Sequence, residues 1–263
     1  MTRIAIVGLG SIGSKHVDTL LKMGYTDLVA VDPRPMPEED RLPVVGELKE
    51  IDGWGTTHAL ICSPPDWHFW QAKCFLDIGV PTFIEKPMTG AASAARILRN
   101  MADANSTVLA VGYMERAHPI VIEARNWAIL HQPTRGEFYC YWRATEKSYA
   151  LNVLDESSHA IDTALFVMGK AVGAKRTGGV GVRASINLTH EEAWSQVTMD
   201  MDATPRRRIQ MYGEGCHFSK DYGTTTDEWD ACYQTELQAF LDGKPLCSGE
   251  DGLAVMEVLE RVR

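Results

Sequence analysis

The chain has 263 residues, of which 45% are hydrophobic and 23% are charged, and its formal net charge at pH 7 is −9. This length favours two domains, and the composition is typical of globular proteins and argues against disorder. The acidic balance, without a basic tract, argues against nucleic acid or an anionic membrane as the partner.

The first 113 residues alternate short apolar runs with amphipathic stretches. Such runs are typical of strands that are buried on both faces of a parallel sheet. We expect strands at residues 3–8, 27–32, 58–63, 81–86 and 107–113, and helices at residues 14–23, 67–78 and 91–104. This repetition predicts a doubly wound α/β domain over residues 1–113.

The pattern changes after residue 113. We expect helices at residues 119–131 and 155–168, and strands at residues 136–143, 180–188, 193–202, 207–213 and 216–221. Two helices close the chain, and the inner stripe of the first is formed by Trp229, Tyr233, Leu237 and Leu241. Residues 114–263 are therefore predicted to form an α+β domain with a mostly antiparallel sheet.

The expected strand at residues 136–143 carries large side chains on both faces. Phe138, Cys140 and Trp142 alternate with Tyr139, Tyr141 and Arg143. One sheet needs only one covered face within a subunit, so the second face predicts burial against another subunit or domain. We expect a homodimer or homotetramer formed through this sheet.

Residues 8–13 fit the pattern G-x-G-x-x-G, between an expected strand and an expected helix. Glycines at these positions allow a tight turn and a close approach of the backbone to a pyrophosphate at the helix N-terminus. The residues expected to bind the cofactor here are Gly8, Gly10, Ser11, Ile12 and Gly13. The alternative is a glycine turn that only packs the helix against the strand.

Asp32 ends the second expected strand, 19 residues after Gly13, where the acidic residue of a dinucleotide site belongs. It would accept hydrogen bonds from the adenosine ribose and repel a 2′-phosphate, which favours NAD. Arg34 leaves NADP open, since its guanidinium is able to pair with that phosphate. Otherwise Arg34 is a solvent-facing loop residue.

Two later strands end in polar side chains. Ser63 and Pro64 end the third strand with His68 just beyond, and Glu85 and Lys86 end the fourth. Ligands of open α/β sheets collect at these carboxyl ends, so we include all five residues in the cofactor site. Taken alone, Lys86 reads as surface charge and His68 as a surface histidine of a helix N-terminus.

Asp155 and His159 are four residues apart in the expected helix 155–168, which places them on one face. A carboxylate beside an imidazole orients the ring and suits acid–base catalysis. The alternative makes Asp155 a helix N-cap and His159 a partly buried packing residue. These residues alone leave the two interpretations equal.

Four segments together resemble the Gfo/Idh/MocA oxidoreductases. They are GLGSIGSKH (8–16), EKP (85–87), VGYMERAHP (111–119) and LDESSHAID (154–162), and the resemblance continues through residues 243–258. It implies a Rossmann domain followed by an α/β domain that is built on a largely antiparallel sheet and binds substrate.

The resemblance also implies roles for individual residues. His159 would take the proton of a sugar or cyclitol hydroxyl, Lys86 would stabilise the developing negative charge, and Asp155 would orient His159. Tyr113 and Arg143 complete the expected substrate contacts. The segment GYMERAHP is similar to members that act on nucleotide-linked sugars.

Two other functions stay open. One is an imine or biliverdin-type reductase, although such enzymes usually lack the full set of Lys86, Asp155 and His159. The other is a non-catalytic NAD-sensing regulatory protein, in which these positions are typically altered.

The six cysteines show no C-x-x-C pair and no metal-ligand spacing, so we expect reduced thiols and no metal site. The N-terminus lacks the pattern of a cleavable signal, and no apolar stretch approaches the roughly 20 residues of a membrane span. A cytoplasmic protein is expected.

Overall fold

The computed structural model describes residues 2–34, 41–51, 55–143, 153–179, 182–223 and 225–263. The chain forms two compact units, one of Met1–Tyr113 with Tyr233–Leu253 and one of Met114–Cys232 with Ala254–Arg263. The sequence-based division assigned residues 114–263 to a single domain. Residues Tyr233–Leu253 instead cluster with the first unit, because part of a late helix contributes to its core.

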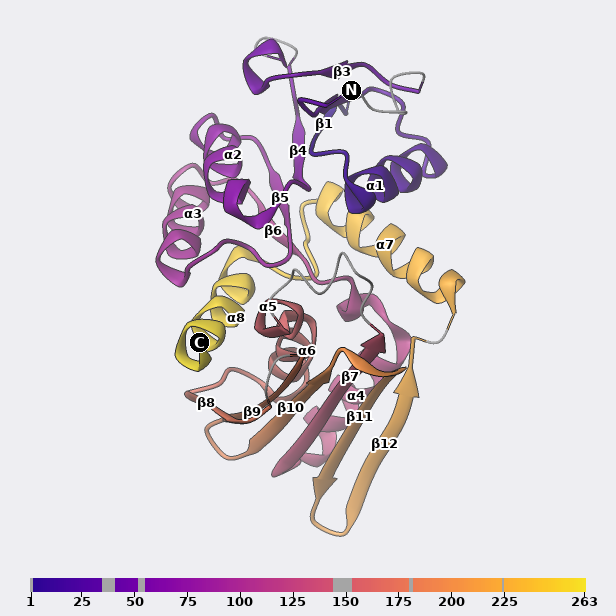
Figure 1. Ribbon diagram of the computed structural model, residues 1–263, viewed down its shortest axis with the longest axis vertical. Helices are drawn as coiled ribbons and strands as arrows, with labels where there is room; N and C mark the ends of the chain where they lie inside the picture. The colour runs from indigo at the N-terminus through magenta and orange to yellow at the C-terminus, as the bar shows by residue number, and fades with distance from the viewer. Residues whose placement is uncertain (1, 35–40, 52–54, 144–152, 180–181, 224) are drawn as a thin grey trace. The chain divides into compact units, whose positions relative to one another are not determined.

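The first unit contains a six-stranded sheet in which every pair is parallel (Figure 1). Its order is β3-β2-β1-β4-β5-β6. The strands are β1 (Ile4–Val7), β2 (Leu28–Val31), β3 (Val44–Val45), β4 (His58–Ile61), β5 (Thr82–Glu85) and β6 (Leu109–Gly112). The expected doubly wound domain is confirmed, with β3 as an additional edge strand.

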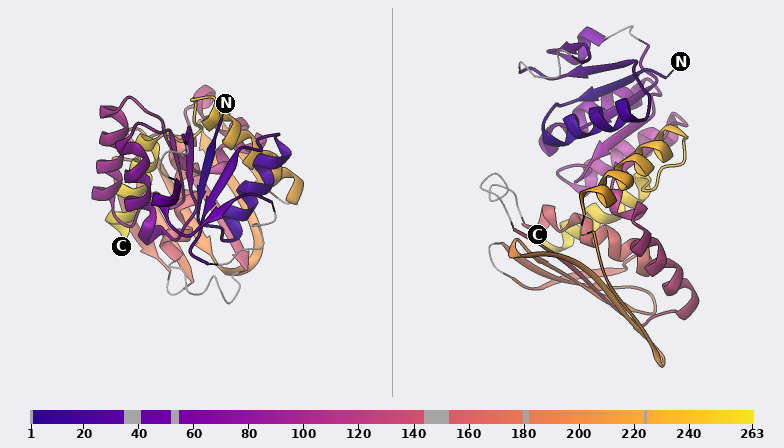
Figure 2. Two further views of the ribbon diagram at one scale, coloured as in Figure 1. Left: turned by 90° about the horizontal axis from the view of Figure 1, so that it is seen from above. Right: turned by 90° about the vertical axis from the view of Figure 1, so that its right-hand side faces the viewer.

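Helices cover both faces of this sheet. They are α1 (Ser11–Lys22), α2 (Pro65–Asp77) and α3 (Ala92–Ala104), with a 3₁₀ turn, η2 (Leu48–Ile51), near β3. Figure 2 shows α1 on one face, and α2 and α3 on the other. All residues of β1, β2, β5 and β6 are buried, as the apolar runs predicted.

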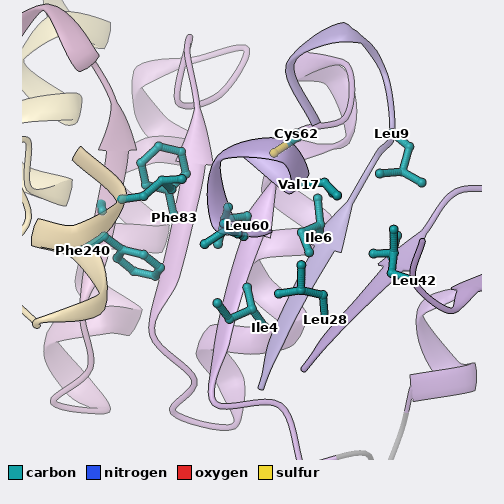
Figure 3. Close-up of a cluster of buried hydrophobic side chains, with 14 residues drawn as sticks. Ile4, Ile6, Leu9, Val17, Leu28, Leu42, Leu60, Cys62, Phe83 and Phe240 are labelled. Carbon is teal, nitrogen blue, oxygen red and sulfur yellow. The ribbon is translucent and has the colours of Figure 1, made fainter. Parts of the chain in front are cut away.

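The core of this unit receives side chains from α7 (Thr226–Leu241) near the end of the chain. Leu237 and Phe240 belong to the same buried cluster as Ile4, Leu60 and Phe83 (Figure 3). The rings of Phe240 and Phe83 lie 5.7 Å apart between centroids. A segment from the C-terminal part of the chain therefore completes the N-terminal core.

The second unit contains a mostly antiparallel sheet, as expected. Its order is β12-β11-β7-β10-β9-β8, and only β7 and β10 pair in parallel. The strands are β7 (Arg135–Arg143), β8 (Gly173–Gly178), β9 (Arg183–Thr189), β10 (Trp194–Asp200), β11 (Asp202–Gly213) and β12 (Cys216–Tyr222).

Helices of the second unit cover one face of its sheet (Figure 2, right). The unit includes η3 (Met114–Ala117), α4 (Pro119–His131), α5 (Val153–Glu156), α6 (Ser158–Met168) and most of α8 (Gly249–Val262). The helix expected at 155–168 is thus divided in two. The side chain of Ser157 hydrogen-bonds the carbonyl of Val153 at 2.7 Å, where the interruption occurs.

Candidate active site

The glycine turn between β1 and α1 is shaped partly by packing. Gly8 has φ of +93°, and a Cβ there would lie 2.7 Å from the backbone of Ser63. A Cβ on Gly13 would lie 1.9 Å from the carbonyl oxygen of Gly8. The structure therefore requires glycine at both positions, whatever the turn binds.

Gly10 is different, because a Cβ there would meet no described atom within 4 Å. It is the N-cap of α1 and has an ordinary φ of −71°, and no described side chain caps the helix. The first amide groups of a helix lack intrahelical acceptors and suit a phosphate. Packing within the described residues therefore does not require glycine at position 10, and the space beside the start of α1 stays open.

Asp32 directly follows β2 and is buried, with 4% of its surface exposed. It accepts hydrogen bonds from the backbone amide of Leu9 at 2.9 Å and from Arg34 Nε and Nη2 at 2.9 and 2.8 Å. The Arg34 guanidinium is the main cause that lowers the pKa of Asp32 to about 2, outweighing burial, which raises it. Asp32 is ionised, and Arg34 is its ion-pair partner.

His68 joins the ends of two strands from the inside. Its side chain is fully buried, with Nδ1 at 3.0 Å from the carbonyl oxygen of Pro87 and Nε2 at 2.7 Å from that of Ser63. Burial lowers the pKa of this imidazole. The ring thus connects the loop after β4 with the loop after β5. The alternative interpretation of His68 as a surface histidine is therefore wrong.

Glu85 supports the loop that carries Lys86. Its carboxylate lies 2.6 Å from Nε2 of the buried His16 on α1, and it accepts the backbone amide of Lys86 at 3.1 Å. A Cβ on Gly112 would lie 3.1 Å from this carboxylate, so a side chain at this position of β6 would require Glu85 to shift. Lys86 is half-buried and precedes a cis proline. At the end of β4, the hydroxyl group of Ser63 donates a hydrogen bond to the side-chain oxygen of Gln71.

The remaining residues predicted for the substrate site are buried or half-buried, or have side chains outside the described residues. Tyr113 follows β6 and has no exposed surface. His159 lies in the first turn of α6 and is half-buried. Arg143 ends β7 and Asp155 lies in α5, but their side chains lie outside the described residues, so contacts of the predicted Asp155–His159 pair stay a prediction.

The sequence analysis did not assign Glu115 and Arg116, two charged residues that the second unit buries. Arg116 forms a bidentate ion pair with Asp162, with Nη2 2.7 Å from Oδ1. Glu115 is 1% exposed and accepts from Arg207 Nε and Tyr222 Oη, both at 2.8 Å. The sequence signal that could have identified them is a pair of adjacent charged residues in an otherwise apolar stretch, between an expected strand and an expected helix.

Burial and ionic contacts act against each other at Glu115. Burial raises the pKa of its carboxyl group, while Arg207, His159 and the hydrogen bonds from Tyr222 and Arg207 lower it, and the net shift is downward. The carboxylate is therefore charged inside the second unit, beside the helix that carries His159.

Within the described part of the chain, no three His, Cys, Asp or Glu side chains are grouped as a metal site requires. No helix among the same residues is long and apolar enough to cross a bilayer. The six cysteines, all of which the structure describes, form no disulfide bond.

Comparison with known proteins places these features in a family. Residues 2–113 match the Gfo/Idh/MocA family, described as oxidoreductases with an NAD-binding Rossmann fold. UDP-N-acetylglucosamine 3-dehydrogenase from Acidithiobacillus ferrooxidans is 30% identical over 243 residues, which cover 85% of this chain and 75% of that protein.

Two further similarities differ in how far they extend. Myo-inositol dehydrogenase Hyg17 from Streptomyces leeuwenhoekii is 27% identical over 122 residues, and the match covers 44% of this chain and 38% of that protein. The WlbA dehydrogenase from Thermus thermophilus, solved with NAD and UDP-GlcNAcA, has a TM-score of 0.82 at 15% identity. That alignment covers 98% of this chain and 94% of the other.

Proposed function

The chain belongs to the Gfo/Idh/MocA oxidoreductase family, and on that basis we propose that it is an NAD-dependent dehydrogenase or reductase. Its substrate is a hydroxyl or ketone carbon of a sugar, a sugar derivative or a cyclitol. The observation that carries the proposal is the combination of Gly10, whose missing side chain leaves open space at the start of α1, with the ionised Asp32.

The residues of the first unit fit the cofactor. The amides at the start of α1 suit the pyrophosphate, and the Asp32 carboxylate suits the adenosine ribose hydroxyls. NAD supplies the hydride acceptor or donor when it is bound. Ser63, Pro64, His68 and Glu85 shape the loops at the same carboxyl edge of the sheet, and Lys86 follows them.

The proton chemistry falls to side chains of the chain itself. His159 takes the proton of the reacting hydroxyl in the oxidative direction and returns it in reduction. Lys86 stabilises the negative charge that develops on that oxygen, and Asp155 orients His159. Tyr113, which is buried, and Arg143 are proposed to help bind the substrate.

We propose a nucleotide-linked sugar as the substrate, rather than a free cyclitol. The similarity to the UDP-N-acetylglucosamine 3-dehydrogenase extends over 85% of this chain, whereas that to the inositol dehydrogenase extends over 44%. A match of 243 residues necessarily extends into the second half of the chain, which is expected to bind substrate.

A substrate screen tests this function. The protein is incubated with NAD or NADP and with UDP-N-acetylglucosamine, other nucleotide sugars, free sugars or myo-inositol, and nicotinamide absorbance is followed. Turnover with a nucleotide sugar and NAD is expected. A second set of incubations, with NADH or NADPH and an imine or biliverdin, tests the reductase alternative, which turnover in this set alone would favour. NAD binding without turnover in either set would favour the regulatory alternative.

We also propose a cytoplasmic homo-oligomer that assembles through the second sheet. Six cysteines without a disulfide bond among them fit a reducing compartment. On the sheet face opposite α4 and α6, the rings of Tyr139 and Tyr141 lie 5.8 Å apart, and Arg135 lies 5.1 Å from the ring centre of the exposed Trp194. Aromatic and arginine side chains on an open face are typical of interfaces.

A further inference from the structure

Two consecutive charged residues join η3 to α6 in the second unit. Arg116 binds Asp162 through two nitrogens, and Glu115 Oε2 accepts from Thr163 Oγ1 at 3.3 Å. The two bonds reach consecutive residues of α6, Asp162 and Thr163. Because side chains four residues apart lie above one another on a helix, His159 lies on the same face of α6 as Thr163, the residue that binds Glu115.

The Glu115 carboxylate is fully coordinated by the protein. Arg207 donates to Oε1, whereas Tyr222 and Thr163 donate to Oε2. These partners come from β11, β12 and α6, and the side chain of Glu115 is 2% exposed. A carboxylate held by three donors in this way has a fixed position and a fixed charge.

We propose that Glu115 is a positioning residue for His159, whose carboxylate stabilises the protonated imidazole and fixes α6 relative to η3. This inference rests on the proposed role of His159 as acid and base. When His159 takes the substrate proton, its new positive charge forms near a negative charge that the fold has already placed. A preorganised charge of this kind needs no rearrangement during the reaction.

Several other ionisable groups lie near α6. The elements packed against α6 are η3, α4, α5, β7 and β10. On the sides that face α6, and among the groups that contact Glu115, the ionisable residues are Glu115 and Arg116 of η3, Arg125 of α4, Asp155 and Glu156 of α5, Cys140 of β7, Arg207 of β11 and Tyr222 of β12. The inner side of β10 carries Ser195, Val197 and Met199, none of them charged. Arg116 is neutralised by Asp162, and Arg125 stacks on Phe166, so Glu115 is the buried anion of η3 that acts on His159.

The test replaces Glu115→Gln, which keeps the shape and removes the charge. An opposite charge near an imidazole raises its pKa by about one unit or more, so the pKa of His159 is expected to fall by about one unit in the variant. Its ring signals, assigned by comparison with His159→Asn, are titrated by NMR. The acid limb of the kcat/KM profile for oxidation should move to lower pH by the same amount.

Two matched variants separate charge from structure. Glu123→Gln removes the same charge from an exposed ion pair with Lys220, where N and O are 2.7 Å apart, and should leave the His159 titration unchanged. Glu115→Asp keeps the charge and should restore most of the pKa. Arg207 stays supported by the Trp229 ring at 4.7 Å, so folded Glu115→Gln protein is expected.

The outcomes distinguish this inference from the function on which it rests. An unchanged His159 titration in folded Glu115→Gln, or an equal shift in Glu123→Gln, overturns the role of Glu115. Failure of Glu115→Asp to restore the titration also overturns it, since a structural defect would then explain the shift. Normal turnover in His159→Asn overturns the proposed function instead.

Discussion

The three glycines between β1 and α1 meet different physical demands. Gly8 and Gly13 lie against backbone atoms, whereas Gly10 faces open space. The motif of three glycines therefore combines two packing requirements with a third position, Gly10, that packing does not require and that we propose for the cofactor. Sequence alone assigns the same role to all three, because it does not reveal what each missing Cβ would contact.

Gly13→Ala and Gly10→Ala should fail in different ways. A Cβ on Gly13 collides with the Gly8 carbonyl at 1.9 Å, so this variant should lose thermal stability. Gly10→Ala should melt within a few degrees of the parent but bind NAD at least ten-fold more weakly, about 1.4 kcal/mol. Calorimetry and thermal melts measure both. Unchanged NAD affinity in Gly10→Ala would remove the pyrophosphate from this turn.

Asp32 and Arg34 together should set cofactor preference. The unaltered protein is expected to bind NAD more tightly than NADP, because the Asp32 carboxylate repels a 2′-phosphate. Asp32→Ala should reduce the difference between NAD and NADP affinity, because Arg34 would then be able to pair with the 2′-phosphate. Arg34→Ala should increase this difference, because it removes the nearby cation. Titration calorimetry with both cofactors gives the four affinities for each comparison. Equal or tighter binding of NADP by the unaltered protein would contradict this assignment.

At the scale of elements, the regular strands and helices follow from the sequence, and the exceptions have physical causes. β3 has two residues, and β8 is an edge strand that begins and ends in glycine, so neither shows a buried alternation. The helix expected at 155–168 is present as α5 and α6 with a turn at Ser157. There the Ser157 side chain bonds the Val153 carbonyl, and the Ser157 amide keeps its helical bond to the same oxygen at 2.9 Å.

The candidate site divides in the same way. The glycine turn and Asp32 are local patterns with a known spacing, so sequence is sufficient to predict them. Glu115 and Arg207 are 92 residues apart, and their pairing depends on how η3 meets β11. No local pattern specifies that contact, and the buried role of His68 likewise depends on two separate loops.

The contribution of α7 to the N-terminal core is testable by truncating one ring. Phe240 is 1% exposed and packs against Phe83 and His58. Phe240→Ala should lower the free energy of unfolding by about 3–5 kcal/mol. Urea unfolding measures it, and Leu130→Ala, at a residue 78% exposed, is the control that should change little. A small effect at Phe240 would mean that α7 is dispensable to that core.

At the scale of the whole molecule, the open face of the second sheet and the chemistry of the site are separate requirements. The sheet has one face covered by α4 and α6 and another that carries aromatic side chains. A sheet face that contacts only solvent needs only polar side chains. The aromatic residues on this face therefore indicate that it has a further function.

Assembly is therefore predicted to depend on this face. Light scattering at micromolar concentration should give two or four times the 29.2 kDa chain mass. Trp194→Glu places a charge on the exposed aromatic patch and should shift the population toward monomer, while the exposed Trp67→Glu on α2 should not. A monomer in the unaltered protein would contradict the predicted interface.

The proposed roles of His159 and Lys86 in the reaction are tested most directly by turnover. Turnover is measured on His159→Ala, Lys86→Met and Asp155→Asn with the substrate found in the screen, beside NAD affinity and melting temperature. The first two should lose about 10²–10⁴-fold in kcat, with NAD binding retained, since each group acts on the transition state. Asp155→Asn should lose less, because the imidazole is still able to accept a proton. Near-normal kcat in folded His159→Ala protein would contradict acid–base catalysis by this histidine.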